Sequence, residues 1–245
     1  MASSTAPVDG SLVPAFKFLH PFRCIVAAPS QSGKTHLVCT ILKHIDQLID
    51  TTTPIQKIIW YYAVWQQDYD QLLIDMTRLH PAINLEFQQG LPPQDYADRF
   101  KDRIPRLIIL DDLMTAVNNT ISELFSLGSH HLNLSLFYLT QNLYSKNKHT
   151  RDLNLNSTYL ILFKNIRDSS QIQHIARQIY PNQGRFLVDA YKDAVNAAPY
   201  AFLLIDLHPR TVDQLRIRGA TSLVTTEPTA TQQQLASQQW LYIPK

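Results

Sequence analysis

The stretch that decides the fold spans residues 23–37 and reads RCIVAAPSQSGKTHL. It opens on the short apolar run Cys24–Ala28, which Pro29 ends, the pattern of a strand buried on both faces of a parallel sheet. From Lys34 to about Ile49, apolar residues recur every three or four positions, which predicts a helix. The polar residues between the two elements therefore form a strand-to-helix turn at one edge of a sheet.

This turn fits the phosphate-loop (Walker A) pattern G-x-x-x-x-G-K-[ST] except at its first position, Ala28. Backbone N–H groups and the positive helix end can cradle phosphates there, and Gly33 allows close approach of the backbone. Lys34 can reach the β and γ oxygens, and the Thr35 hydroxyl can bind Mg²⁺. An ordinary turn with an exposed lysine is the alternative. Ala28 can alter the tightness of the loop, and Pro29 removes one amide donor. The predicted nucleotide-binding residues are Ala28, Pro29, Ser30, Gln31, Ser32, Gly33, Lys34 and Thr35.

Apolar runs and helical periodicity alternate along the rest of the chain. This alternation predicts an α/β fold in which a mainly parallel central sheet is flanked by helices. Residues 21–218 are expected to form one domain, preceded by a loose arm over 1–20 and followed by a mobile tail over 219–245. The expected strands cover 57–63, 83–87, 106–110, 134–140, 158–164 and 201–207, and the expected helices after the first cover 66–79, 115–127 and 170–180.

Two adjacent carboxylates end the most apolar of these strands, which reads LIIL over 107–110. In open α/β sheets, ligands bind at the carboxyl edge of the strands, where Asp111 and Asp112 would lie. Asp111 is the predicted Mg²⁺ ligand beside Thr35, and Asp112 is predicted to orient or deprotonate an attacking water. Alternatively, the pair caps the helix expected near Thr115.

A polar pair also ends the strand over 134–140. Gln141 can position a water molecule, because its amide both donates and accepts hydrogen bonds. A loop that simply begins with polar residues is the alternative.

Basic side chains concentrate in one part of the chain. The formal net charge is +2, too low for a dedicated nucleic-acid coat protein, but residues 142–192 hold eight Lys or Arg against three Asp. Lys146, Lys148 and Arg151 are expected in a polar loop, and Arg167 follows the next strand. Such residues can neutralise DNA phosphates, and Arg151 or Arg167 can act as an arginine finger; simple solvation is the alternative.

The composition indicates a folded globular protein. With 45% hydrophobic and 17% charged residues, the chain is typical of a folded globular protein. Its two cysteines, Cys24 and Cys39, have no metal-ligand or redox spacing and predict buried thiols in a reducing compartment. No signal peptide or long apolar run is present, so we expect an intracellular, soluble protein without membrane partners.

Four segments together resemble one family. They are SGKTHL at 32–37, LIILDDL at 107–113, FYLTQNLY at 137–144 and RDLNLNSTYLILFKNIRD at 151–168. The combination resembles viral genome-packaging ATPases of the FtsK/HerA-type P-loop group, as found in Maverick/Polinton elements, adintovirus-like viruses, virophages and poxvirus relatives. The resemblance covers about residues 20–218 and includes the segments Gln171–Pro181 and Leu203–Pro209.

The resemblance implies a RecA-like core that uses ATP and Mg²⁺ and assembles into a homo-oligomeric ring. It further implies translocation of double-stranded DNA into a capsid, contact with viral capsid proteins, and action in the host cell at the site of virion assembly, the nucleus. The active site is expected to be completed by an arginine finger from a neighbouring subunit, with Arg151 favoured over Arg167. Ala28, and the Asp111-Asp112 pair where related motors carry Asp-Glu, depart from the family pattern.

Particular residues bear on other classes of protein. A GTPase-like switch is suggested by NIRD at 165–168, but its lysine is missing and DDLM at 111–114 lacks the glycine of a γ-phosphate switch. A nucleotide-free scaffold would not need both the phosphate loop and the acidic strand. Among enzymes, a DNA helicase or replication-initiator ATPase is the alternative to a packaging motor.

Overall fold

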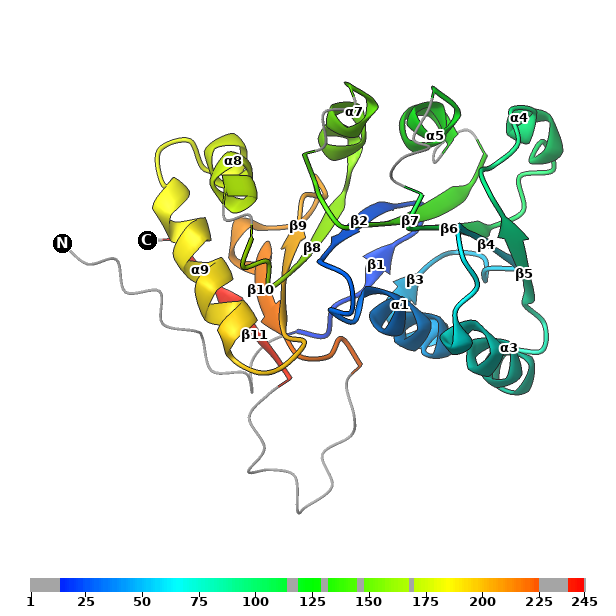
Figure 1. Cartoon of the computed structure of the whole chain (residues 1–245), viewed down its shortest axis with the longest axis horizontal. Coiled ribbons are helices and arrows are strands. Elements are labelled where there is room, and N and C mark those ends of the chain that lie inside the picture. Colours follow the sequence, from blue (N-terminus) through cyan, green and yellow to red (C-terminus); the bar gives the residue numbers. More distant parts are fainter. Residues whose placement is uncertain are drawn as a thin grey trace, which may run out of the picture. The chain divides into compact units, whose positions relative to one another are not determined.

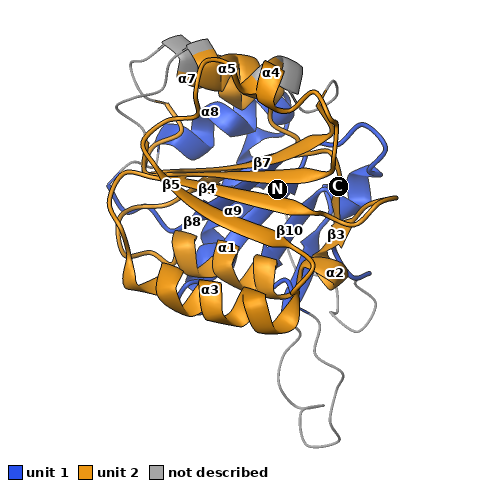
Figure 2. Cartoon of the chain, turned by 90° about the vertical axis from the view of Figure 1, so that its right-hand side faces the viewer, with its two compact units in different colours: residues 1–16, 159–245 blue, residues 17–158 orange. Residues whose placement is uncertain are grey.

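The computed structural model describes residues 14–113, 119–128, 132–144, 148–167, 170–224 and 238–244. The chain divides into two compact units, residues 17–158 and residues 1–16 with 159–245 (Figure 2). One domain over 21–218 stays a prediction. No Pro- or Gly-rich linker marks the boundary at 158/159, and such linkers are the usual sequence signal of a division. Among the described residues, no helix is both long and apolar enough to cross a membrane.

The unit over 17–158 is built on a parallel sheet with the strand order β2-β7-β6-β4-β5 (Figure 1). Every residue of β6 and β7 is buried, as their continuous apolar runs predict. The strands are β2 (Arg23–Ala27), β4 (Lys57–Tyr62), β5 (Asn84–Gln89), β6 (Arg106–Asp111) and β7 (Leu134–Thr140).

Helices cover both faces of this sheet. Figure 2 shows α1 and α3 on one face and α4, α5 and α7 on the other. The predicted α/β class, with a mainly parallel sheet flanked by helices, is therefore confirmed. The helices are α1 (Lys34–Lys43), α2 (Ile45–Leu48), α3 (Gln67–Leu79), α4 (Tyr96–Arg99), α5 (Asn119–Glu123), a π-helical turn (Leu124–Gly128) and α7 (Lys148–Asn156).

Three local expectations in this unit differ from the structure. The helix expected over 34–49 breaks at His44, and α2 then leads into β3 (Ile49–Asp50). β3 pairs with β1 (Phe18–Leu19), so the expected N-terminal arm contains a strand, and Phe18 is fully buried. The third difference is α7, which replaces the polar loop expected around Arg151. This segment was predicted as a loop because most of its residues are polar, but it forms a helix in which Leu153 is buried.

The second unit contains an antiparallel sheet with the order β11-β10-β9-β8. Its strands are β8 (Tyr159–Phe163), β9 (Phe202–Asp206), β10 (Ile217–Ala220) and β11 (Gln239–Tyr242), and its helices are α8 (Ser170–Ile179), α9 (Gly184–Asn196) and the 3₁₀ turn Asp213–Leu215. Strand–helix alternation predicted a parallel pairing here. Two helices instead of one separate β8 from β9, so the chain reaches β9 from the opposite end. Helix α9 was not predicted.

Strand β11 lies within the segment expected as a tail. Gly219 of β10 pairs with Trp240 of β11, and a Cβ added at Gly219 would collide with the Trp240 indole. The Tyr242 hydroxyl donates a hydrogen bond to Asp193 of α9. The tail over 219–245 is thus anchored through a strand, while residues 225–237 lie outside the described range.

Candidate functional site

The predicted site residues gather where three neighbouring strands of the 17–158 unit end. Strand β7 lies between β2 and β6, with Ala27 opposite Thr140 and Asp111 opposite Leu139. The phosphate loop follows β2, the two aspartates end β6, and Gln141 follows β7. Parallel pairing therefore brings together segments that are up to about a hundred residues apart in the chain.

The backbone of the phosphate loop accommodates alanine at its first position. Within the loop, φ is positive at Gln31 (61°) and Gly33 (88°), but not at Ala28. Ala28 is 1% exposed, and its N–H donates to the Thr140 carbonyl at 3.0 Å. Because a methyl group fits there without left-handed backbone geometry, this position does not require glycine.

Lys34 begins α1 and turns back into the loop. Its side chain is buried, and Nζ donates to the carbonyl oxygens of Ala28 at 2.8 Å and Pro29 at 3.1 Å. Burial lowers the pKa of Lys34, while the negative charges of Asp112 and Asp111 act in the opposite direction. The lysine is therefore an internal cation of the loop, in contrast to the exposed lysine of an ordinary turn.

Asp111 is the buried carboxylate of the site, with 1% exposure. One of its oxygens, Oδ2, accepts hydrogen bonds from Thr35 Oγ1 at 3.2 Å and from the Tyr69 hydroxyl at 2.8 Å. Burial raises the pKa of Asp111, and the hydrogen bonds from Tyr69 and Thr35 partly offset that effect. The two predicted Mg²⁺ ligands, Thr35 and Asp111, are thus in direct contact.

Asp112 has a different environment from its neighbour. Its side chain is exposed, its backbone is left-handed with φ 55°, and its Oδ1 accepts a hydrogen bond from Gln141 Nε2 at 3.1 Å. Aspartate tolerates this backbone conformation better than most residues. The structure therefore pairs the two residues that were predicted to handle the attacking water.

Tyr69 is a site residue that the sequence analysis missed. It lies on α3, 42 residues before Asp111 in the chain, and it is fully buried. A tyrosine on the apolar face of an amphipathic helix is typical of a core position, and no motif distinguishes it from one. Only the fold shows that its hydroxyl reaches the carboxylate.

The two residues predicted as arginine fingers lie in different units of the chain. Arg151 is exposed on α7, and no hydrogen bond or ion pair links it to Lys34 or Asp112, all of which the structure describes. Arg167 belongs to the other unit, where its side chain is exposed and its backbone N–H donates a hydrogen bond to Asn165 Oδ1. Lys146 and Asp168 lie outside the described residues. The finger remains a prediction.

The oxygen donors at Asp111 and Thr35 fit Mg²⁺. The described residues contain no group of three or more His, Cys, Asp or Glu side chains that could hold a metal without a ligand. Mg²⁺ in nucleotide sites commonly uses only one or two protein oxygens, with substrate phosphates and waters completing its coordination. The donor set therefore suits a metal that arrives with a phosphorylated substrate.

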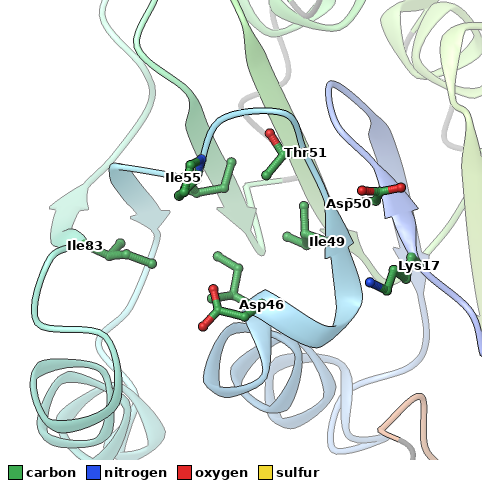
Figure 3. Close-up of a pocket in the computed structure, with 9 residues that line it drawn as sticks. Lys17, Asp46, Ile49, Asp50, Thr51, Ile55 and Ile83 are labelled. Carbon is green, nitrogen blue, oxygen red and sulfur yellow. The ribbon is translucent and has the colours of Figure 1, made fainter.

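A separate cavity of about 210 Å³ lies elsewhere in the same unit (Figure 3). Its lining residues include Ile55 and Ile83, which precede β4 and β5. It therefore lies toward the amino ends of these strands, away from the carboxyl edge that carries the phosphate loop. Its lining residues are Lys17, Ile45, Asp46, Ile49, Asp50, Thr51, Pro54, Ile55 and Ile83.

Comparisons with known proteins add little to this geometry. No protein-family model and no curated protein matches the chain. Among solved structures, the cytoplasmic domain of the Thermomonospora curvata Type VII secretion ATPase EccC is similar, with a TM-score of 0.46 and 12% identity over 75% of this chain and 24% of that one. The chain thus spans about a quarter of that structure. This similarity assigns neither a family nor an activity, so the function is argued from the site.

Proposed function

We propose that the chain is a Mg²⁺-dependent ATPase. The observation that carries the proposal is the contact between Thr35 of the phosphate loop and Asp111 at the end of β6, 76 residues apart in the chain. A hydroxyl and a carboxylate joined beside a buried lysine form the protein's part of a phosphate and magnesium site. Neither a helix cap nor a solvated turn needs this arrangement.

The loop residues would bind and neutralise the triphosphate. The Lys34 ammonium would exchange its bonds to the Ala28 and Pro29 carbonyls for the β and γ oxygens of ATP. Bound Mg²⁺ would supply positive charge to the same oxygens. Thr35 and Asp111 would hold that ion, directly or through water.

Asp112 and Gln141 would act on the water. Asp112 would orient the water molecule and accept a proton from it while the water oxygen bonds to the γ-phosphorus. Gln141 would hold the Asp112 carboxylate in place. The bond between the γ-phosphorus and the β–γ bridging oxygen breaks, and ADP leaves with that oxygen. Phosphate and ADP are the products.

We further propose that hydrolysis drives movement of double-stranded DNA, in a homo-oligomeric ring that packages a viral genome into a capsid. This finer proposal rests on the resemblance of the sequence and on the basic surplus over 142–192. DNA should stimulate the ATPase, and DNA binding should weaken steeply with salt and depend little on base sequence. Translocation on blunt duplex, compared with strand separation on a forked substrate, distinguishes the motor from a helicase.

The ATPase proposal is tested by Lys34→Ala. Loss of the loop cation should lower ATP turnover about a hundredfold or more. Lys43→Ala is the matched control, because Lys43 ends the same helix and pairs with Asp75 at 3.6 Å. Phosphate release is measured for both proteins, and circular dichroism verifies their folding. Wild-type turnover in Lys34→Ala would refute the proposal.

A further inference from the structure

An aromatic cluster surrounds the residue that the sequence analysis missed. Tyr69 packs against Trp60 and Phe87, each with ring centroids at 5.1 Å, and against Trp65 at 5.4 Å. These rings come from β4, β5, α3 and the segment just before α3, all within the 17–158 unit. The members of this aromatic cluster are Trp60, Tyr62, Trp65, Tyr69 and Phe87.

The cluster holds the Tyr69 ring in one place. The ring is 0% exposed and stacks on Phe87 at an interplanar angle of 27°, while Trp65 meets it edge-on at 89°. A ring packed from several sides cannot move its hydroxyl away from Asp111 without displacing its neighbours. The hydrogen bond of 2.8 Å is therefore built into the core of the unit.

We propose that Tyr69 is a positioning residue for the metal site. It donates to the same Asp111 oxygen as Thr35 does, and two donors on one oxygen fix the rotation of the carboxylate. That rotation determines where the second oxygen, Oδ1, meets Mg²⁺ or its water. The inference rests on the proposed function, and it assigns Tyr69 no contact with nucleotide or reacting atoms.

The surroundings of Tyr69 favour its protonated phenol. Burial, followed by the negative charge of Asp111, raises the pKa of its phenol far above the ordinary value. As the donor to Asp111 Oδ2 at 2.8 Å, the hydroxyl is suited to orienting the carboxylate. Loss of a residue that orients a metal ligand typically lowers metal affinity or activity about tenfold to a hundredfold.

The test removes only the hydroxyl, with Tyr69→Phe. Tyr62→Phe is the matched control, because it deletes a phenol from the same cluster, with its ring 5.7 Å from that of Tyr69. Binding of a non-hydrolysable ATP analogue is titrated with Mg²⁺, and a parallel titration without Mg²⁺ reports contacts of the phosphate loop. We expect Tyr69→Phe to raise the Mg²⁺ concentration for half-maximal enhancement about tenfold and to leave Mg²⁺-free binding unchanged.

Trp65→Leu keeps the hydroxyl but removes one supporting ring. Trp65 is 43% exposed, so this variant should fold even if Tyr69→Phe does not. It should raise the half-maximal Mg²⁺ concentration about twofold to threefold, in the same direction as Tyr69→Phe.

The outcomes separate the two proposals. Asp111→Asn should abolish the Mg²⁺ enhancement, and a wild-type protein that shows none would refute the proposed metal site together with this inference. If wild type and Asp111→Asn behave as expected but Tyr69→Phe matches Tyr62→Phe, only the positioning role is refuted. Unchanged Mg²⁺ dependence in Trp65→Leu would likewise count against it.

Discussion

Two strands of the molecule, one in each compact unit, end in nearly the same way. β6 reads RLIILD and ends at Asp111, whereas β9 reads FLLID and ends at Asp206. Both aspartates are buried, and burial raises the pKa of each. In strand pattern and in burial, the two aspartates are alike.

Their hydrogen-bond partners distinguish them. Asp206 is bound by its own turn, with His208 N–H donating to Oδ1 and Thr211 Oγ1 donating to Oδ2, each at 2.9 Å. Asp111 is bound on one oxygen by two side chains from distant elements, Thr35 and Tyr69. A carboxylate that closes its own turn has a structural role, whereas one that joins separate elements at the edge of a sheet is positioned for a ligand.

The strongest test of this difference is the pair Asp111→Asn and Asp206→Asn. Loss of the metal carboxylate removes several kcal/mol of transition-state stabilisation, so Asp111→Asn should lower ATP turnover about a thousandfold. Asp206→Asn should keep turnover within about twofold. Phosphate release at saturating Mg²⁺ is the measurement, and equal losses in the two variants would remove the distinction.

The residue after each aspartate sharpens the comparison. The Asp112 side chain accepts a hydrogen bond from Gln141, whereas the residue after Asp206 is Leu207, which has an apolar side chain. A carboxylate that acts on the water works mainly in the transition state. Asp112→Asn should therefore lower turnover about a hundredfold and leave ATP affinity nearly unchanged, as measured by turnover and equilibrium binding. A large loss of affinity would instead indicate a role in binding.

The smallest expected effect concerns stability without nucleotide. In Asp111→Asn the amide oxygen can accept both existing hydrogen bonds while the buried charge disappears, so we expect a gain of about 1 kcal/mol at neutral pH. Asp206→Asn must lose one of its two bonds, because they fall on different oxygens, and should cost about 1–2 kcal/mol. Urea denaturation checks both values. Changes of the same sign would contradict the comparison.

The pH dependence follows from the raised pKa of Asp111. The folded protein holds the Asp111 proton more tightly than the unfolded chain does, so stability falls as pH rises from 3.8 through the raised value. Asp111→Asn removes this loss. Its advantage in the free energy of unfolding should therefore be greatest above that window and shrink toward pH 3.

The sequence predicted the elements that carry continuous apolar runs or a motif. Strands β6 and β7 lie where they were expected, because buried parallel strands are apolar throughout. Asp112 and Gln141 were each expected at the carboxyl edge of the sheet because polar residues end their strands, and the structure adds the hydrogen bond between them. Local pattern and sheet geometry were sufficient for both.

The features that were missed depend on packing between distant segments. The Tyr69–Asp111 contact needs the position of α3 on the sheet, which no spacing in the sequence encodes. Helix α7 is mostly polar, and the direction of β9 depends on the second helix of its connection, α9. In each case the arrangement of elements in the fold, rather than the pattern of one segment, decided the outcome.

The glycine beneath Trp240, Gly219, favours one register for the pairing of β11 with β10. The Trp240 indole covers Gly219, where a side chain would collide with it. A register shift of one residue would move each side chain of β11 to the opposite face of the sheet. The bare backbone at Gly219 leaves the space that the Trp240 ring occupies when β11 pairs with β10. Strand β11 therefore covers the edge of β10 that would otherwise offer unpaired backbone groups to another strand.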